Sequence, residues 1–140
     1  MNNTNPTTKQ ISKKITDLNA DVADEFVKNK LFHFDEKYEK NKALITTSQI
    51  RKFLSAVNCL ENKISSSPEE LPQDIANEIK YLKVKLAYQV GRENKNRGLR
   101  NLYNEIEPLI SQIGTNKSNF AKVTRYIEAI VAYHKFNGGE

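Results

Sequence analysis

Tyr81, Lys85, Tyr88 and Arg92 form the pattern in this sequence that most suggests chemistry, because tyrosine and a cation alternate at helical spacing. Residues three and four positions apart lie on one stripe of a helix. Cations on such a stripe can hold phosphates, and a tyrosine ring can stack on a base or donate its hydroxyl. The stripe is equally compatible with tyrosines that pack under a neighbouring helix while the cations reach out to solvent.

The same part of the chain concentrates the positive charge. From residue 79 to residue 100 there are seven cations and one acidic residue, Glu93, an excess of six, whereas the whole chain has a net charge of only +5. The cations are Lys80, Lys83, Lys85, Arg92, Lys95, Arg97 and Arg100. A local field of this kind attracts polyanions such as nucleic acids. A solvated helix face followed by a flexible basic loop is the alternative.

Two further helix faces could bind a partner. One is polar with a single charge and consists of Arg51, Ser55, Asn58 and Asn62. Because such a face costs little to desolvate, it could lie against a partner or a sugar–phosphate backbone, or it could be ordinary exposed surface. The other face is rich in small residues and consists of Ala121, Arg125, Ala129, Ala132 and Phe136. It could pack inside the chain or against another subunit.

No pattern in the sequence predicts catalysis, a metal or a cofactor. The glycines fit neither a phosphate-binding loop nor a dinucleotide-binding turn. His33 and His134 have no nearby ligand partners and are expected to be surface or packing residues. Cys59, the single cysteine, lies beside an apolar helix face and is expected to be a half-buried structural thiol. We therefore expect a protein that is not an enzyme.

Composition predicts an all-α protein. The 140 residues are 38% apolar and include only 5 glycines and 4 prolines, too few turn residues for a sandwich or barrel. No apolar run approaches the roughly 18 residues of a membrane span. The polar N-terminus does not resemble a secretory signal. These observations predict a cytoplasmic protein with no membrane partner.

Periodicity predicts where the helices lie. Thr46 and Gln49 form a capping box, and Ile45 and Ile50 form a hydrophobic staple around it. The expected helices span about 8–29, 46–64, 72–92, 99–113 with a kink at Pro108, and 118–137, and no strand-like alternation is present. We expect a compact bundle of about four long helices plus an N-terminal helix or extension. Residues 1–44 would be an extension that is partly helical and could be flexible, and residues 45–140 the bundle domain.

A short apolar cluster, Leu31, Phe32 and Phe34, ends the N-terminal part, and a charged connector follows it. We expect all three side chains to contribute to the core. Each large apolar side chain contributes about 1.5–3 kcal/mol when it is fully buried.

Three blocks of sequence resemble a known family. They are TTSQIRKFLSAVNCLENKI (46–64), IKYLKVKLAYQVGRE (79–93) and FAKVTRYIEAIVAYHKF (120–136). Together they are similar to the small subunit of the type III-A CRISPR effector, the Csm complex, over about residues 45–138. The resemblance implies an all-α, non-catalytic subunit whose copies stack head to tail as the inner filament of a ribonucleoprotein, beside the backbone subunits and in contact with the large subunit.

The resemblance also implies partners, guide RNA and target RNA, whose backbones would be held without sequence specificity. The basic residues that we expect to face RNA are Arg51, Lys52, Lys80, Lys83, Lys85, Arg92, Arg125 and Lys135. An alternative function is a helical protein–protein adaptor without direct RNA contact. In that case the tyrosine and cation stripe would lie buried at a protein interface.

Overall fold

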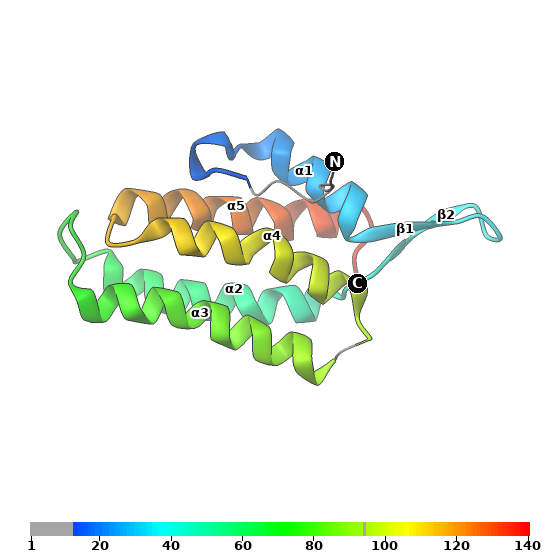
Figure 1. Ribbon diagram of the computed structural model, residues 1–140. Coiled ribbons are helices and arrows are strands. Elements are labelled where there is room, and N and C mark those ends of the chain that lie inside the picture. The colour runs from blue at the N-terminus through cyan, green and yellow to red at the C-terminus, as the bar shows by residue number, and fades with distance from the viewer. Residues whose placement is uncertain (1–12, 94) are drawn as a thin grey trace, which may run out of the picture.

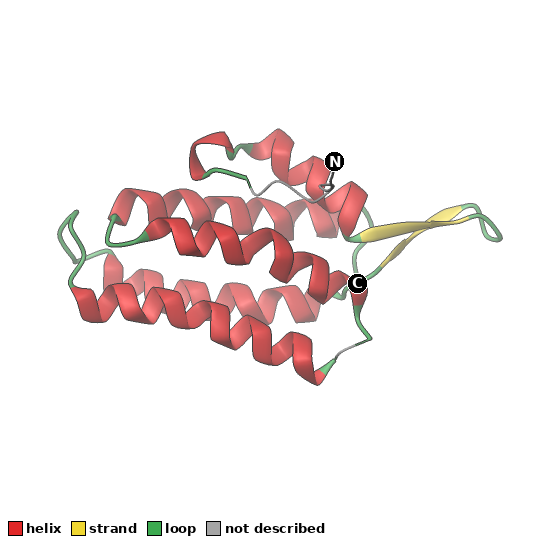
Figure 2. Ribbon diagram, in the orientation of Figure 1, coloured by secondary structure: helices red, strands yellow, loops and turns green. Residues whose placement is uncertain are grey.

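The described part of the chain folds into a bundle of five α-helices with a small β-hairpin at one end (Figures 1 and 2). The computed structural model describes residues 13–93 and 95–140. The helices are α1 (Ala20–Lys30), α2 (Thr47–Ile64), α3 (Gln73–Arg92), α4 (Arg97–Ile113) and α5 (Lys117–Phe136), and the strands are β1 (Phe32–Asp35) and β2 (Lys40–Ala43). The all-α bundle predicted from the sequence is confirmed, and the hairpin is an addition to it.

The helices form layers. Figure 1 shows α2 and α3 side by side, α4 and α5 above them, and α1 lying on α5. One continuous core contains buried residues from all five helices, including Phe26 of α1, Val57 of α2 and Ile127 of α5. The segment from α1 to the hairpin therefore packs on the same core as the four long helices.

The predicted start of α2 is confirmed in detail. The Thr46 hydroxyl accepts a hydrogen bond from the backbone N–H of Gln49 at 3.1 Å, and the Gln49 side chain accepts one from the Thr46 N–H at 2.8 Å. Ile45 and Ile50, on either side of this cap, are both buried. Because two otherwise unpaired N–H groups are satisfied at once, the helix has a sharply defined beginning.

The later helices also lie close to where periodicity placed them. Asparagine side chains cap two of them: Asn96 accepts from Leu99 N–H at 2.8 Å and Asn116 from Asn119 N–H at 2.9 Å. α4 continues through Pro108 to Ile113. The α5 helix begins at Lys117, one residue before the predicted position.

The hairpin corrects the expectation that no strand is present. β1 and β2 pair antiparallel, with Phe32 opposite Ala43 and Asp35 opposite Lys40. Glu39 takes a positive φ of 51°, which closes the turn. Each strand has four residues and only Phe32 is buried, so the alternation is too short to be recognised in the sequence. The charged connector is therefore a hairpin that projects from the bundle (Figure 1).

The N-terminal helix is shorter than predicted. Over the described part of the expected 8–29 helix, α1 begins only at Ala20, because Asn19 has an extended backbone and its side chain caps Val22 N–H at 2.8 Å. Ile15 lies before it in a single 3-10 turn and is buried. The rest of the expected helix, residues 8–12, lies outside the described residues.

Two side chains differ from the sequence-based expectation. Phe34 is 52% exposed, because β1 carries it beyond the edge of the bundle, while Leu31 and Phe32 are buried. Cys59 is exposed, since it lies on the part of α2 that faces the surface groove next to α3. Neither residue contributes a buried group to the core.

His134 is a buried packing residue that joins the end of α5 to the chain before α2. Its Nε2 donates to the Ile45 carbonyl at 2.7 Å, its Nδ1 lies 3.4 Å from the Thr47 hydroxyl, and its ring lies against Phe32. Burial lowers the pKa of His134 below its ordinary value of 6.5. The imidazole of His134 is therefore neutral in this buried contact between α5 and the chain before α2.

Gly98 allows a second close contact at the same end. A Cβ atom at this position would lie 2.7 Å from the carbonyl oxygen of Leu44 and 2.7 Å from the Cβ of Ile45. The first turn of α4 therefore packs directly on the backbone that leads into α2, and only glycine permits that approach.

We predict that Leu31→Ala and Phe34→Ala have very different effects on stability. Leu31 is fully buried, so its truncation should lower the free energy of unfolding by about 2–5 kcal/mol through lost burial and a residual cavity. Phe34→Ala should cost less than about 1 kcal/mol because its side chain is half in water. Urea denaturation measures both values, and equal losses would contradict the placement of these side chains.

We predict that acidification destabilises the fold through His134. Between the lowered pKa of folded His134 and the ordinary 6.5, the unfolded chain takes up a proton and the folded one does not. Stability contributed by the neutral ring should thus be complete above pH 6.5 and fall as the pH drops below it. Melting temperatures between pH 7.5 and 5.5 should show a shallower decline in His134→Gln, while His33→Gln, at an exposed position, should keep the wild-type slope.

Candidate nucleic-acid interface

A surface groove between α2 and α3 brings together three of the cations expected to bind RNA. Lys52 of α2 and Lys85 and Arg92 of α3 line it. The remaining lining residues are Phe53, Ala56, Tyr88 and Gln89. Lys85 and Arg92 are seven residues apart on one helix, which corresponds to about 10 Å along its axis. The groove thus presents cations from two helices toward the same strip of surface.

Gln49 fixes the end of this groove. Besides closing the α2 capping box, its side chain donates to Glu93 at 2.6 Å and accepts from Asn96 at 3.3 Å. Its backbone carbonyl accepts from the Gln89 side chain at 3.2 Å. The start of α2 is therefore tied to the end of α3 and the start of α4, which holds Arg92 beside α2.

The three groove cations are available for an external anion. Within residues 13–93 and 95–140, no acidic side chain forms an ion pair with Lys52, Lys85 or Arg92. The Arg92 guanidinium lies 5.9 Å from the centre of the Tyr88 ring, a cation–π contact that helps to orient it along the groove. Unpaired cations with an aromatic neighbour are the groups that bind a phosphodiester backbone.

The groove continues past Ala56 and Lys85 toward the other end of the two helices, where its charge is neutralised. Lys63 pairs with Glu78 at 3.1 Å across the helices. Cys59 and Tyr81 also line this part, and the Tyr81 side chain is 57% exposed. The positive charge of the groove is therefore concentrated near Lys52, Lys85 and Arg92.

The structure places three other expected residues outside the groove lining. Arg51 is exposed on the outward face of α2, together with Ser55, Asn58 and Asn62. Lys80 is exposed on the other flank of α3. Lys83 is directed to α4, where its ammonium lies 3.5 Å from Glu107 and donates to the Ser111 hydroxyl at 2.9 Å. Lys83 thus already has a partner within the fold.

Arg125 and Lys135 lie on α5, away from the α2–α3 groove. Arg125 is exposed and lines a separate depression with Leu18, Asn19 and Ala20 at the start of α1. Lys135 is exposed in the last turn of α5. Phe136, which shares the small-residue face of α5 with Arg125, is also exposed. The structure therefore does not unite these two cations with Lys52, Lys85 and Arg92.

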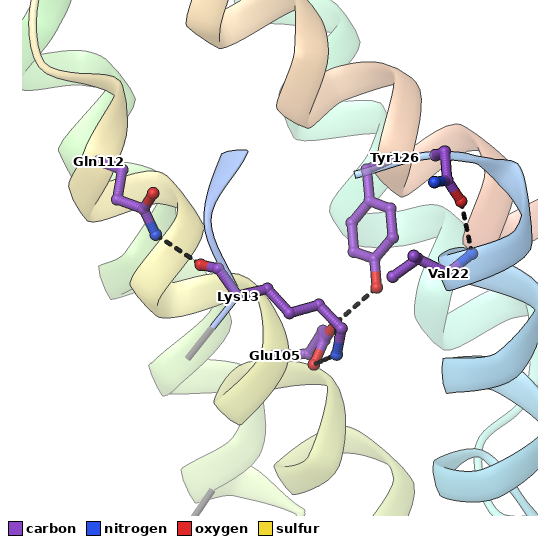
Figure 3. A network of polar contacts seen from close by, with 6 residues as sticks. Lys13, Val22, Glu105, Gln112 and Tyr126 are labelled. Atoms are coloured by element: carbon purple, nitrogen blue, oxygen red, sulfur yellow. Dashed lines mark hydrogen bonds and ion pairs between the residues drawn. The ribbon is translucent and has the colours of Figure 1, made fainter. Parts of the chain in front are cut away.

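A partly buried polar network between α4, α5 and the segment before α1 was not visible in the sequence. Figure 3 shows Tyr126 of α5 donating to Glu105 of α4, which also pairs with Lys13 at 2.8 Å. Burial, and then the hydrogen bond to Glu105, raise the pKa of Tyr126 well above its usual value. Tyr126 is therefore a neutral hydrogen-bond donor that links α5 to α4. No short-range motif could reveal it, because its partners come from distant segments.

Gln112 completes the attachment of the segment before α1. Its amide group accepts from Ile15 N–H at 3.1 Å. It also donates to the Lys13 carbonyl at 2.8 Å, as Figure 3 shows. One side chain thereby satisfies two backbone groups, as a neighbouring strand would. Residues 13–15 are consequently fixed along α4.

Across residues 13–93 and 95–140, no group of three or more His, Cys, Asp or Glu side chains is arranged to hold a metal ion. Nor does any helix there have the length and apolar character needed to span a membrane.

These features define a small helical protein with a basic groove between two of its helices. A family model described as Csm2 Type III-A matches residues 25–140. The chain therefore belongs to the Csm2 family of type III-A CRISPR systems. This finding confirms the family inferred from the three sequence blocks.

Curated relatives agree with the family model, and each is named CRISPR system Cms protein Csm2. The protein from Streptococcus thermophilus is 38% identical over 105 residues, covering 75% of this chain and 83% of the relative. The protein from Enterococcus italicus is 35% identical over 66% of this chain and 67% of its own length. A relative from Mycobacterium tuberculosis is 31% identical over 82% of this chain and 93% of its own length.

We predict that Tyr126→Phe destabilises the protein although the change removes a single oxygen atom. Glu105 would lose a buried donor, which should cost about 1–3 kcal/mol in the free energy of unfolding. Tyr103→Phe is the matched control, because the Tyr103 hydroxyl makes no hydrogen bond within residues 13–93 and 95–140. Chemical denaturation compares the two variants, and equal stabilities would show that the network contributes nothing.

Proposed function

We propose that this chain is a non-catalytic structural small subunit of a type III-A CRISPR ribonucleoprotein, a cytoplasmic antiviral complex. It binds the backbone of guide and target RNA through the groove between α2 and α3. The observation that carries this proposal is the convergence of Lys52, Lys85 and Arg92 on one strip of surface without an acidic partner among the described residues. Family membership supplies the complex in which the groove would act.

The groove suits contact without sequence reading. Its cations are on helix faces and can bind phosphates, which are identical in every RNA, whereas base readout needs groups that reach base edges. Copies stacked head to tail along the RNA, beside the backbone subunits and next to the large subunit, would each add a few such contacts. Avidity along the filament then supplies affinity that one copy lacks.

The other expected residues have graded roles in this proposal. Arg51 extends the basic surface over the outward face of α2, and Lys80 extends it over the far flank of α3. Arg125 and Lys135 would contact RNA only where it also passes α5. Lys83 would have to exchange its contacts with Glu107 and Ser111 for a phosphate. We therefore place the principal contacts at Lys52, Lys85 and Arg92.

We predict that the triple variant Lys52→Ala, Lys85→Ala, Arg92→Ala weakens RNA binding by the assembled complex equally for unrelated target sequences. Losing three phosphate contacts from each bound copy should flatten the slope of log K against log salt by up to about 2 units per copy. Filter binding across a salt series, with complexes of verified composition, measures the affinity and the slope.

A charge-matched control separates local contacts from net charge. Lys14→Ala, Lys28→Ala, Lys30→Ala removes three exposed cations from the α1 region and should leave affinity and slope near wild type. If the groove variant assembles normally and binds RNA with an unaltered salt slope, the groove is ordinary solvated surface. The adaptor function without RNA contact would then be favoured.

A further inference from the structure

The outward face of α3 carries an exposed apolar stripe that the fold does not use. Tyr81, Val84 and Tyr88 are 57%, 49% and 67% exposed. They follow one another at spacings of three and four residues, on the side of the helix away from its buried residues Ile79 and Leu86. Half of the large exposed apolar side chains in the described residues therefore lie on this one face.

Gly91 continues the same stripe, three residues beyond Tyr88. It has ordinary helical backbone, and a Cβ atom at this position would meet nothing within 4 Å. A glycine inside a helix costs stability relative to alanine, and nothing in residues 13–93 and 95–140 requires one here. The missing side chain leaves room for another molecule to approach the backbone of α3.

The geometry of the stripe matches a second helix better than RNA. Apolar positions at alternating spacings of three and four residues form the seam of helix pairs that cross at a shallow angle. Val84, in the middle of the stripe, is aliphatic and cannot stack on a base, but it can enter the space between side chains of a facing helix. A small residue at Gly91 would let the two backbones come close.

The charges beside the stripe specify the partner. Lys80 lies on one side and Lys85 and Arg92 on the other, and the sequence from Lys80 to Arg92 contains no acidic residue. Two copies that met through this face would oppose like charges. A helix whose apolar positions are flanked by Asp or Glu would be complementary on both sides.

We propose that Tyr81, Val84, Tyr88 and Gly91 form a docking face for an acid-flanked amphipathic helix of a different protein. This inference goes beyond the RNA-binding role. Neither Val84 nor Gly91 lines the α2–α3 groove, so the two surfaces can be tested separately. The two surfaces share Tyr81 and Tyr88 and border each other at Lys85 and Arg92, so a docked helix would form one wall beside the bound RNA.

Site-specific photo-cross-linking tests the proposal in the assembled type III-A complex with its guide RNA. Val84 is replaced by p-benzoylphenylalanine, and the cross-linked product is identified by mass spectrometry. The expected product joins residue 84 to a helix of another protein with acidic residues beside its apolar positions. A product with RNA, with a second copy of this chain or with a surface lacking acidic residues would overturn the proposal, as would the absence of any product.

Gly91→Leu provides an independent measurement. Leucine favours helix and should keep or raise the melting temperature of the isolated chain, yet it fills the approach to the backbone. The probe is the effector complex assembled without this chain, and the variant should bind it at least tenfold more weakly than wild type does. Asn104→Leu, at an exposed position on α4, should bind normally. If Gly91→Leu binds the effector complex with unchanged affinity, the docking face is overturned. The salt slope of RNA binding by the groove variant tests the RNA-binding proposal separately.

Discussion

The hydrogen bonds of Gln49 are the constraint on which the arrangement of this bundle most depends. One side chain closes the cap of α2 and at the same time contacts the end of α3 and the start of α4. A helix cap normally defines only its own helix. Here it also sets how α2 and α3 lie relative to each other, and the basic groove exists because that spacing is maintained.

The same end of the molecule contains several further long-range contacts. His134 connects the end of α5 to Ile45, the hairpin emerges beside it, and Gly98 lets α4 rest on Leu44. The opposite end is formed by the α2–α3 and α4–α5 connections, where Leu71 N–H donates to the Thr115 carbonyl. Lys52 and Arg92 lie toward the first end, where Gln49 joins α2 to the end of α3.

The sequence was sufficient for features that depend on neighbours along the chain. The capping box at Thr46 and the inner face of α3 follow from local spacing and are correct in the structure. The stripe with Tyr81 and Lys85 also follows from local spacing, but only the structure shows that its tyrosines are exposed and not packed under a neighbouring helix. The hairpin was missed because its strands have four residues each and only Phe32 is buried, so the sequence shows no recognisable alternation of apolar and polar residues. Features that join distant segments, such as Tyr126 with Glu105 or Lys83 with Glu107, have no local signal at all. This is why three groove cations could be named in advance, but not separated from Lys83, which has a partner.

The contact at Gly98 also bears on how the chain folds. Helical hairpins such as α2–α3 can form from residues close in sequence, and bundles of this kind usually fold quickly for that reason. The start of α4, however, can reach its final position only against the backbone of Leu44, which lies before both α2 and α3. Closing that loop costs less entropy once the intervening helices have formed, because they shorten the flexible chain between the two segments. The contact thus couples the N-terminal and C-terminal halves and favours a single cooperative transition over stepwise assembly of separate helix pairs.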